Sequence, residues 1–444
     1  MSRPASTGLG ARTATGLLTD HYELTMIAGA LQAGIADHRA IFETFARILP
    51  GGRRYGVFAG LGRLADALAR FRFDPEELAW LSDRNIMDDA TLDWLASYRF
   101  RGTVTAYPEG DLYFPHSPVV RVEGGFAESV VLETIVLSHL NFDSAIASAA
   151  ARMVTAAKGR RLLEFGSRRT HEEAAIAAAR AAYLVGFDST SNLEAGRRYG
   201  IPTSGTSAHA FTLAFPDEPA AFRAQLKTLG TSTTLLVDTF DVGKGVRNAV
   251  EAAGGGLGAV RIDSGELREE TLRARAQLDE LRAPGAKIVL SGDLDEYRIA
   301  ELGDAPADAL GIGTRLVTGS GAPTGEFVYK LVAVADRPGA DAPLRSVAKA
   351  GGVKSTVGGR KRAWRERDLT GTAIAEVVTT EDAEPPANAR DLQTPVMIDG
   401  VLLDLPSLDE MRAAHEAAKA ELPEVAHRLD EGPPAIPTRR RHDQ

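Results

Sequence analysis

The chain has 444 residues, of which 44% are hydrophobic and 25% are charged, and this composition is far from that of the disordered or membrane classes. The absence of cysteine excludes disulfides, thiolate zinc sites and a cysteine nucleophile. The formal net charge of −9 argues against a surface that coats nucleic acid, so we expect no nucleic-acid partner.

We expect residues 1–14 to form a flexible N-terminus. Their sequence, MSRPASTGLGARTA, has no apolar core of signal-peptide length. No later run approaches the roughly 18 apolar residues of a membrane span. These features favour a cytoplasmic protein that does not bind a membrane.

Residues 15–158 are expected to form an N-terminal part that is helical and β-sandwich-like. Residues 15–100 read as mostly helical. Thr19 or Asp20 is the expected N-cap of the first helix, and Gly34 is its expected stop.

The rest of this part changes character twice. Residues 100–123 are rich in β-branched and aromatic residues and are broken by Pro and Gly, so we expect short antiparallel strands there. Residues 126–157 return to apolar positions at helical spacing, with several small residues that allow close packing.

Residues 159–328 alternate short apolar runs with polar or helical stretches. Continuous apolar runs are typical of buried parallel strands, and their alternation with helices is typical of repeated βα units. Seven such strands favour an α/β fold with a closed or nearly closed β/α barrel. The runs are RLLEFG, AYLVGFD, IPTSGTSAH, TLLVDTFD, VRIDSG, KIVLSGD and ALGIGTR.

Polar residues end nearly every one of these runs. Catalytic groups converge at the carboxyl ends of the strands in β/α barrels, although structural strand caps would explain some of these positions. The residues at the ends of the runs are Glu164, Asp188, His209, Asp238, Asp263, Asp293 and Thr314.

The chain after the barrel resumes the β-like style of residues 100–123. Residues 329–428 contain VYKLVAVAD, APLRSVAKA, IAEVVTT and TPVMIDGVLL, followed by the amphipathic segment LDEMRAAHEAAKAEL. We expect them to return to the flanking α+β domain and to end in a helix. Residues 429–444, rich in Pro, Gly and Arg, are expected to form a flexible, solvated tail.

The last two apolar runs predict a phosphate site. Their small residues let backbone amides approach an anion, and barrels often bind phosphate after strands seven and eight. Glycine after a strand also simply makes turns, but two such turns at consecutive strand ends favour the phosphate interpretation. The residues concerned are Ser291, Gly292, Asp293, Gly311, Gly313 and Thr314.

Two further segments carry charged and aromatic side chains at strand ends. Arg261 and Asp263 are two residues apart, hence on one side of the strand, where Arg suits a phosphate and Asp suits ribose hydroxyls or magnesium. The alternative is an internal Arg–Asp pair. Phe165 offers a stacking face, and Arg168 or Arg169 offers a clamp for a carboxylate. Core packing and helix ion pairs are the alternatives for these residues.

His209 lies in SGTSAHAF, among small residues that leave an imidazole accessible. An accessible imidazole serves as a general base, a metal ligand or a nucleophile that accepts a phosphoryl group. A purely structural histidine is the alternative.

Taken together in order and spacing, several motifs resemble those of the nicotinate phosphoribosyltransferases. They extend from about residue 17 to residue 365 and are TDHYELTM, FARILPGGRRYGVFAGL, EFGSRR, GFDSTSNLEAG, GTSAHAF, RIDSG, SGDLDEY and GIGTRLVT. The resemblance implies that nicotinate and phosphoribosyl diphosphate give nicotinate mononucleotide and diphosphate, a salvage step towards NAD. It also implies coupled ATP hydrolysis and a requirement for Mg²⁺, with no metal ligands assigned.

The resemblance assigns roles to individual residues. His209 matches the histidine that ATP phosphorylates, Phe165 the ring that stacks on the pyridine, and Arg168 the group near its carboxylate. Arg261 and Asp263 are similar to residues that hold diphosphate and ribose. The glycine-rich turns after the last two runs correspond to the 5′-phosphate cradle.

Other positions complete the expected site. Tyr22, with Asp20 nearby, resembles a residue that reaches the active site of a neighbouring subunit, which implies a homodimer with shared sites. Ser191 and Asp238 complete the expected substrate-binding set. The segment KSTVGGRKRAWR resembles a Lys-rich loop of the family but lacks its Pro-Gly-Lys-Lys pattern, so Lys361 receives no role.

Four alternatives remain open from the sequence. A nicotinamide phosphoribosyltransferase would carry an Asp near Ser191, and a quinolinate enzyme would need a denser basic cluster. A Schiff-base aldolase or isomerase would need a Lys in the barrel mouth, where only Lys244 comes close. A non-catalytic nucleotide sensor would not need the intact His209 and Asp263.

Overall fold

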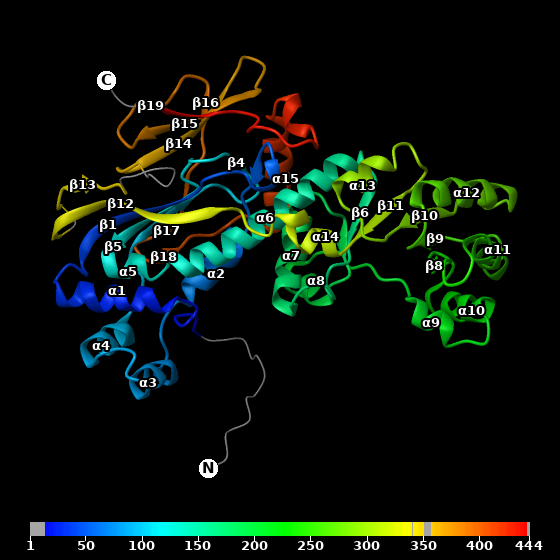
Figure 1. Ribbon diagram of the computed structural model, residues 1–444, viewed down its shortest axis with the longest axis horizontal. Coiled ribbons are helices and arrows are strands. Elements are labelled where there is room, and N and C mark those ends of the chain that lie inside the picture. The colour runs from blue at the N-terminus through cyan, green and yellow to red at the C-terminus, as the bar shows by residue number, and fades with distance from the viewer. Residues whose placement is uncertain (1–13, 340, 350–356, 442–444) are drawn as a thin grey trace, which may run out of the picture. The chain divides into compact units, whose positions relative to one another are not determined.

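The computed structural model describes residues 14–339, 341–349 and 357–441, and the chain divides into two compact units. Unit 2 comprises Ala145–Pro323 and His427–Glu431, and the remaining described residues belong to unit 1. Figure 1 labels the elements of both units. Residues 1–13 of the expected N-terminus, 354–356 of the Lys-rich segment and 442–444 of the expected tail lie outside the described residues.

Unit 1 is built around a seven-stranded antiparallel sheet that joins segments from before and after the barrel sequence. One interior strand, the third in the order below, pairs with a neighbour from each part of the chain. In sheet order the strands are β13 (Leu344–Ser346), β12 (Phe327–Pro338), β1 (His38–Ala46), β5 (Val120–Gly125), β3 (Thr103–Ala106), β17 (Thr394–Ile398) and β18 (Val401–Leu402).

Strand β1 corrects the mostly helical interpretation of residues 15–100. Seven consecutive residues of this strand, from Ala40 to Ala46, are buried. A strand covered on both faces shows no alternation of polar and apolar residues, so its sequence carries no period of two. Only its pairing with β5 and β12 reveals it as an interior strand of the sheet.

The helices of unit 1 lie mainly in its N-terminal part. Asp20 takes the N-cap position of the first helix, and Gly34 follows its end with a left-handed φ of 72°. The helices are α1 (His21–Gln32), α2 (Leu61–Ala69), α3 (Pro75–Asp83), α4 (Asp89–Ser97), α5 (Phe126–Val130) and α15 (Leu408–Ala420), with α6 (Glu133–Ala157) running on into unit 2. A two-stranded ladder joins β2 (Gly56–Val57) to β4 (Leu112–Tyr113).

A second sheet of unit 1 contains the end of the described chain. Its strands, in order, are β16 (Ala389–Asp391), β14 (Lys361–Arg367), β15 (Ala373–Thr380) and β19 (Thr438–Arg441). Strand β19 pairs in parallel with β15, so the expectation of a flexible tail is wrong for residues 438–441, although the side chains of residues 439–441 are exposed to solvent. The free edge of a sheet can pair with the backbone of many different segments. A run of arginines therefore gives no sequence signal for this pairing.

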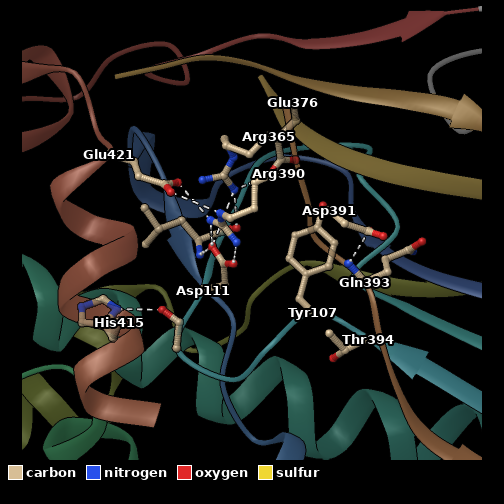
Figure 2. Close-up of polar contacts among 12 residues, drawn as sticks. Tyr107, Asp111, Arg365, Glu376, Arg390, Asp391, Gln393, Thr394, His415 and Glu421 are labelled. Atoms are coloured by element: carbon tan, nitrogen blue, oxygen red, sulfur yellow. Dashed lines mark hydrogen bonds and ion pairs between the residues drawn. The ribbon is translucent and has the colours of Figure 1, made fainter. Parts of the chain in front are cut away.

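A buried charge network holds this second sheet to the rest of unit 1 (Figure 2). Arg365 is 0% exposed and lies 2.6 Å from a carboxylate oxygen of Glu376. Arg390 forms ion pairs with Asp111 at 2.6 Å and with Glu421 at 2.9 Å. The network therefore connects β14, β15 and β16 with the residue before β4 and the residue after α15.

Unit 2 contains a six-stranded sheet in which every pair of neighbours is parallel. The chain makes β6 and β7, passes to the opposite edge, and returns through β8, β9 and β10 to place β11 beside β6. In sheet order the strands are β7 (Ser189–Thr190), β6 (Arg161–Glu164), β11 (Ala309–Ile312), β10 (Lys287–Leu290), β9 (Ala259–Ile262) and β8 (Thr234–Leu236).

Helices connect these strands, as expected for βα units. Helices α10, α11 and α12 pack against one another in chain order beside the β8–β9–β10 part of the sheet (Figure 1). The helices are α7 (Glu172–Leu184), α8 (Leu193–Tyr199), α9 (His209–Leu213), α10 (Glu218–Leu229), α11 (Val242–Ala253), α12 (Leu267–Glu280), α13 (Glu296–Glu301) and α14 (Thr314–Val317).

The sheet is a partial barrel with six strands instead of the expected seven. Most of AYLVGFD belongs to the end of α7 and the turn after it, so Asp188 precedes β7 and accepts a hydrogen bond from the Leu162 amide. In IPTSGTSAH only Thr203 forms an isolated bridge, to Thr190. Its Gly and Ser residues offer little apolar surface to a sheet, so the segment runs as a loop to α9.

The inner face of the partial barrel is apolar. Leu163, Ala259, Val289 and Ala309, one from each of four adjacent strands, form a buried cluster against which Phe165 packs. The prediction of an α/β fold with a β/α barrel and a flanking α+β domain is confirmed, with the barrel partly open in the described residues.

One helical segment, residues 126–157, is long and apolar enough to cross a membrane. Of its most apolar window, 61% is buried within the protein, which is the burial of a core helix. The expectation that no run approaches a membrane span is therefore wrong for this segment, because its length and composition match those of a spanning helix.

Candidate active site

The ends of β9 and β10 form the polar centre of the candidate site. Arg261 donates from Nε to the Ser291 hydroxyl at 2.8 Å and from a terminal nitrogen to Asp263 at 3.0 Å. Ser291 also donates to Asp263. Burial alone would raise the pKa of Asp263, but the Ser291 hydrogen bond and the Arg261 charge lower it below its usual value. The site thus holds a guanidinium next to an ionised carboxylate.

Glycines after β10 and within β11 leave room that a side chain would fill. A Cβ at Gly292 would lie 2.5 Å from the Asp263 carbonyl oxygen, and φ there is +116°. A Cβ at Gly311 would lie 2.4 Å from the Phe165 ring. Both positions therefore need glycine, because the Asp263 backbone and the Phe165 ring pack closely against them, and the phosphate interpretation of these glycines stays a prediction.

A cavity of about 180 Å³ gathers the residues expected at the phosphate site. It brings together all six positions singled out in the last two strand ends, and it adds both candidate arginines of the turn after β6. Its lining is Phe165, Arg168, Arg169, Arg261, Asp263, Ser291, Gly292, Asp293, Gly311, Gly313 and Thr314.

A second cavity, of about 400 Å³, shares Phe165, Arg168 and Arg261 with the first. The Arg261 guanidinium lies 5.5 Å from the centre of the Phe165 ring. Ser191 lines this cavity together with residues 204–208. An aromatic face, two guanidiniums and several hydroxyls are suited to a flat, anionic, ring-shaped ligand.

Residues 204–207 are functional candidates that the sequence interpretation missed. Their sequence, SGTS, was treated as the approach to His209 only. In the structure they line the second cavity, and the Thr206 hydroxyl lies 3.4 Å from an Arg261 nitrogen that donates to it. A run of small hydroxyl residues just before a short helix was the available signal.

His209 opens α9, and its side chain is 42% exposed. Its Nδ1 lies 3.3 Å from the Thr239 hydroxyl, and its Nε2 lies 3.9 Å from a carboxylate oxygen of Asp238. The other Asp238 oxygen accepts hydrogen bonds from the Asp263 amide and the Ser264 hydroxyl. Asp238 therefore links the histidine to the Arg261–Asp263 centre.

Two further residues named from the sequence, Tyr22 and Lys361, lie in unit 1. The Tyr22 side chain on α1 is 47% exposed, and partial burial and the charge of Glu133 raise its pKa. Lys361 pairs with the buried Glu43 at 2.8 Å and donates to the carbonyl oxygens of Val357 and Gly359. Those contacts engage Lys361 within unit 1, whereas the role of Tyr22 stays a prediction.

Within the described ranges, no group of three or more His, Asp and Glu side chains is arranged to hold a metal ion. Asp238, Asp263 and Asp293 lie at neighbouring strand ends, and one Asp238 oxygen is buried without a hydrogen-bond partner there. This donor set fits a magnesium ion that takes one or two carboxylates and completes its shell with substrate oxygens and water.

The architecture is shared with solved enzymes. The human nicotinic acid phosphoribosyltransferase matches with a TM-score of 0.79 and 28% identity, covering 95% of this chain and 97% of that chain. The nicotinate-nucleotide pyrophosphorylase of Pyrococcus furiosus matches with a TM-score of 0.77 and 26% identity, covering 95% and 99%. A partial β/α barrel with cavities at its strand ends, combined with an α+β unit, thus defines a phosphoribosyltransferase of the barrel type.

Sequence comparison identifies the family. The model of the nicotinate phosphoribosyltransferase N-terminal domain matches residues 17–141, and the model of the nicotinate phosphoribosyltransferase family matches residues 160–337. A nicotinate phosphoribosyltransferase of Mycobacterium tuberculosis is 53% identical over 435 residues, which are 96% of this chain and 95% of the relative. The chain belongs to the nicotinate phosphoribosyltransferase family, enzymes of NAD salvage.

Proposed function

We propose that the chain joins nicotinate to the phosphoribosyl group of phosphoribosyl diphosphate, and that it couples this reaction to ATP hydrolysis through His209. The products are nicotinate mononucleotide and diphosphate. The observation that carries the proposal is the pair of adjoining cavities that share Phe165, Arg168 and Arg261. One cavity suits an aromatic carboxylate and the other suits a phosphorylated sugar.

The larger cavity is the proposed nicotinate subsite. The pyridine ring would stack on Phe165, and Arg168 would bind the carboxylate through two parallel hydrogen bonds. Ser191 lines the same cavity. A carboxylate at this position would repel nicotinate, so a neutral serine favours the acid over the amide.

The smaller cavity is the proposed subsite for phosphoribosyl diphosphate. The glycine-rich turns after β10 and β11 would cradle the 5′-phosphate through backbone amides, with the Ser291 and Thr314 hydroxyls beside them. Arg261 would bind the diphosphate, and Asp263 would accept hydrogen bonds from the ribose hydroxyls.

This arrangement suits a displacement at the anomeric carbon of ribose. The pyridine nitrogen, unprotonated at neutral pH, forms the new bond to carbon while diphosphate leaves with the electron pair of the broken bond. The carbon becomes oxocarbenium-like as the bonds exchange, so cations near the leaving group lower the barrier. Mg²⁺, held by Asp238 or Asp263 and by the substrate, would neutralise charge on the diphosphate. General acid–base catalysis is not needed.

His209 is the proposed acceptor of the γ-phosphoryl group of ATP. Its ring is accessible, and Asp238 and Thr239 lie at its two nitrogens. Phosphoryl transfer to the ring releases ADP, and later hydrolysis of the phosphohistidine releases phosphate. In this way ATP hydrolysis would favour substrate binding and drive the synthesis of the mononucleotide.

The proposal includes a homodimer, in which Tyr22 of one subunit reaches the active site of the other, and a cytoplasmic location. The resemblance of TDHYELTM to the family motif supports the role of Tyr22. Its partly exposed ring on α1 is free enough to contact a second chain.

A substrate panel tests the proposed function. The purified protein is incubated with phosphoribosyl diphosphate, Mg²⁺ and nicotinate, nicotinamide or quinolinate, each with and without ATP. We expect the mononucleotide of nicotinate to form, with stimulation by ATP and with ADP released alongside it. Preferred use of nicotinamide or quinolinate would overturn the substrate assignment, and a rate indifferent to ATP would overturn the coupling.

A further inference from the structure

Glu164, the last residue of β6, is a buried carboxylate beside the proposed nicotinate subsite. It is 1% exposed. One of its oxygens accepts a hydrogen bond from the Gly166 amide, and the other accepts one from the Thr190 hydroxyl at 2.5 Å. Burial raises the pKa of Glu164, and the two hydrogen bonds oppose that rise without cancelling it. The Glu164 carboxylate therefore bridges the turn after β6 and the end of β7.

These bonds are part of a closed ring between the segment after β6 and the segment after β7. The Thr190 hydroxyl accepts a hydrogen bond from the Asn192 amide at 2.9 Å. The Asn192 side chain donates to the Ser167 hydroxyl at 3.0 Å. Ser167 follows Gly166 in the chain, so the ring closes on Glu164.

The two segments joined by the ring carry the nicotinate subsite. Phe165, Ser167 and Arg168 come from the first segment and Ser191 from the second, and all four line the larger cavity. The backbone adds only one direct bond between the segments beyond the paired strands, from the Ser191 amide to the Glu164 carbonyl oxygen at 2.8 Å. Beyond that bond, the spacing of the two segments depends on side chains.

The Glu164 carboxylate is tightly packed on the side of Gly166. A Cβ at Gly166 would lie 2.8 Å from the Glu164 oxygen and 2.2 Å from a Val317 side-chain carbon. An apolar residue would fill such a position at a lower cost of burial, since removing a carboxyl group from water is unfavourable. What the carboxyl group adds is two directional hydrogen bonds.

We propose that Glu164 is a positioning residue for the aromatic acid substrate: by bonding Gly166 and Thr190 it sets the distance between the Phe165–Arg168 turn and Ser191. This inference rests on the proposed function for the identity of the substrate. The phosphoribosyl diphosphate subsite shares Phe165 and Arg168, but its glycine-rich turns and its Arg261–Asp263 centre come from β9, β10 and β11, which in the described structure make no hydrogen bond to the Glu164 side chain. Loss of the bonds therefore weakens the binding of nicotinate more than that of the sugar phosphate.

Kinetics of two matched pairs of variants test this role. Glu164→Ala removes both bonds, whereas Glu164→Gln keeps an acceptor for Gly166 and an amide that donates to Thr190. Thr190→Val removes two bonds of the ring, to the Glu164 carboxylate and from the Asn192 amide, at nearly constant volume, and Thr190→Ser restores the hydroxyl. We expect Glu164→Ala and Thr190→Val to raise KM for nicotinate about tenfold, with KM for phosphoribosyl diphosphate changed less than about threefold. We expect Glu164→Gln and Thr190→Ser to bring KM for nicotinate most of the way back to the wild-type value.

Two kinetic outcomes would overturn the proposal. One is an equal rise of both KM values in step with a fall in Tm, which would indicate general destabilisation. The other is equal impairment by the Ala and Gln substitutions, because the bonds would then not be what matters. If Glu164→Ala does not fold, Thr190→Val and Thr190→Ser provide the same comparison.

Hydrogen–deuterium exchange tests the ring without using catalysis. We expect amides in segments 165–169 and 191–195 to exchange faster in Glu164→Ala than in the wild-type protein, while segments 259–262 and 287–290 stay unchanged. Unchanged exchange in the first two segments would overturn the ring. A wild-type protein without activity on nicotinate would overturn the proposed function instead, so the two failures are distinguishable.

Discussion

A carboxylate oxygen of Asp238 lies 3.9 Å from Nε2 of His209, and in the described part of the chain that oxygen is buried with no hydrogen-bond partner. Leaving a buried acceptor unsatisfied is costly. The cost falls when the imidazole turns so that its Nε2–H donates to the carboxylate. The pair is therefore arranged to orient the ring.

Substitution of His209 tests its part in ATP coupling. We expect His209→Ala to abolish the stimulation by ATP and the release of ADP, while slow ATP-independent synthesis of the mononucleotide remains. The cavities keep their lining, since His209 belongs to neither of them. Initial rates with and without ATP check this. Stimulation equal to that of the wild-type protein would remove His209 from its assigned role.

Substitution of Asp238 tests whether His209 needs the negative charge of this side chain. Asp238→Asn keeps an acceptor for the Asp263 amide and the Ser264 hydroxyl but removes the negative charge facing His209. We expect the ATP-stimulated rate to fall about tenfold, the size expected for losing a charge-assisted hydrogen bond, and the ATP-independent rate to fall less, since Asp263 remains as a carboxylate that can hold Mg²⁺. Phosphohistidine formed from radiolabelled ATP provides a direct measurement. Undiminished labelling would show that the Asp238 charge is not needed.

The close approach of Gly311 to Phe165 supports a third prediction. A Cβ at residue 311 would lie 2.4 Å from the Phe165 ring, so Gly311→Ala must move the ring that both cavities share. We expect KM to rise about tenfold or more for nicotinate and also to rise for phosphoribosyl diphosphate. Steady-state kinetics check the result.

Gly285→Ala is the matched control for this substitution. A Cβ at residue 285 would meet no atom within 4 Å, and its backbone does not adopt a left-handed conformation. We expect its kinetics to equal those of the wild-type protein. Equal loss of activity in both variants would contradict the account of Gly311.

The fold class and the grouping of residues at the strand ends could be predicted from the sequence, whereas two individual strands could not. Strand-end residues such as Arg261 and Asp293 follow apolar runs in a repeated pattern, and parallel strands bring their carboxyl ends to one edge. Strand β1 could not be recognised, because burial on both faces removes its period. Strand β19 depends on backbone pairing to β15, a long-range contact with no local signal in TRRR.

The missed cavity lining has a related cause. Residues 204–207 gain their place from the crossing of the chain between the two edges of the sheet, which apolar periodicity does not encode. The ring through Glu164 was missed because it joins residues 26 positions apart, of which only Glu164 had drawn attention. In both cases the sequence pattern indicated one residue of a group whose other members come together only in the folded protein.

The Arg365–Glu376 pair provides a prediction about stability. Both side chains are 0% exposed, so Arg365→Met leaves the Glu376 carboxylate buried without its partner. We expect a loss of roughly 3–5 kcal/mol in the free energy of unfolding. The double variant with Glu376→Leu should recover much of that loss, because no unpaired charge remains. Chemical denaturation measures both.

An exposed arginine serves as the control for this prediction. Arg197 pairs with Glu194 at the surface, where its side chain is 71% exposed. We expect Arg197→Met to leave the denaturation midpoint unchanged, since surface ion pairs contribute little. Similar midpoints for Arg365→Met and Arg197→Met would contradict a stabilising role for the buried network.

Glu23 on α1 makes stability depend on pH in an unusual direction. It is 0% exposed, and burial raises its pKa from 4.5 to about 7, with hydrogen bonds from Thr134 opposing the rise and Glu133 and Asp20 adding to it. The stability that protonated Glu23 contributes is complete below pH 4.5 and is lost as pH rises through 7. Glu23→Gln cannot ionise, so its Tm relative to the wild-type protein should rise by a few degrees between pH 5 and pH 8.

Glu76→Gln, at an exposed position on α3, is the control for removal of a charge. A Tm difference between Glu23→Gln and the wild-type protein that stays constant with pH would contradict this account.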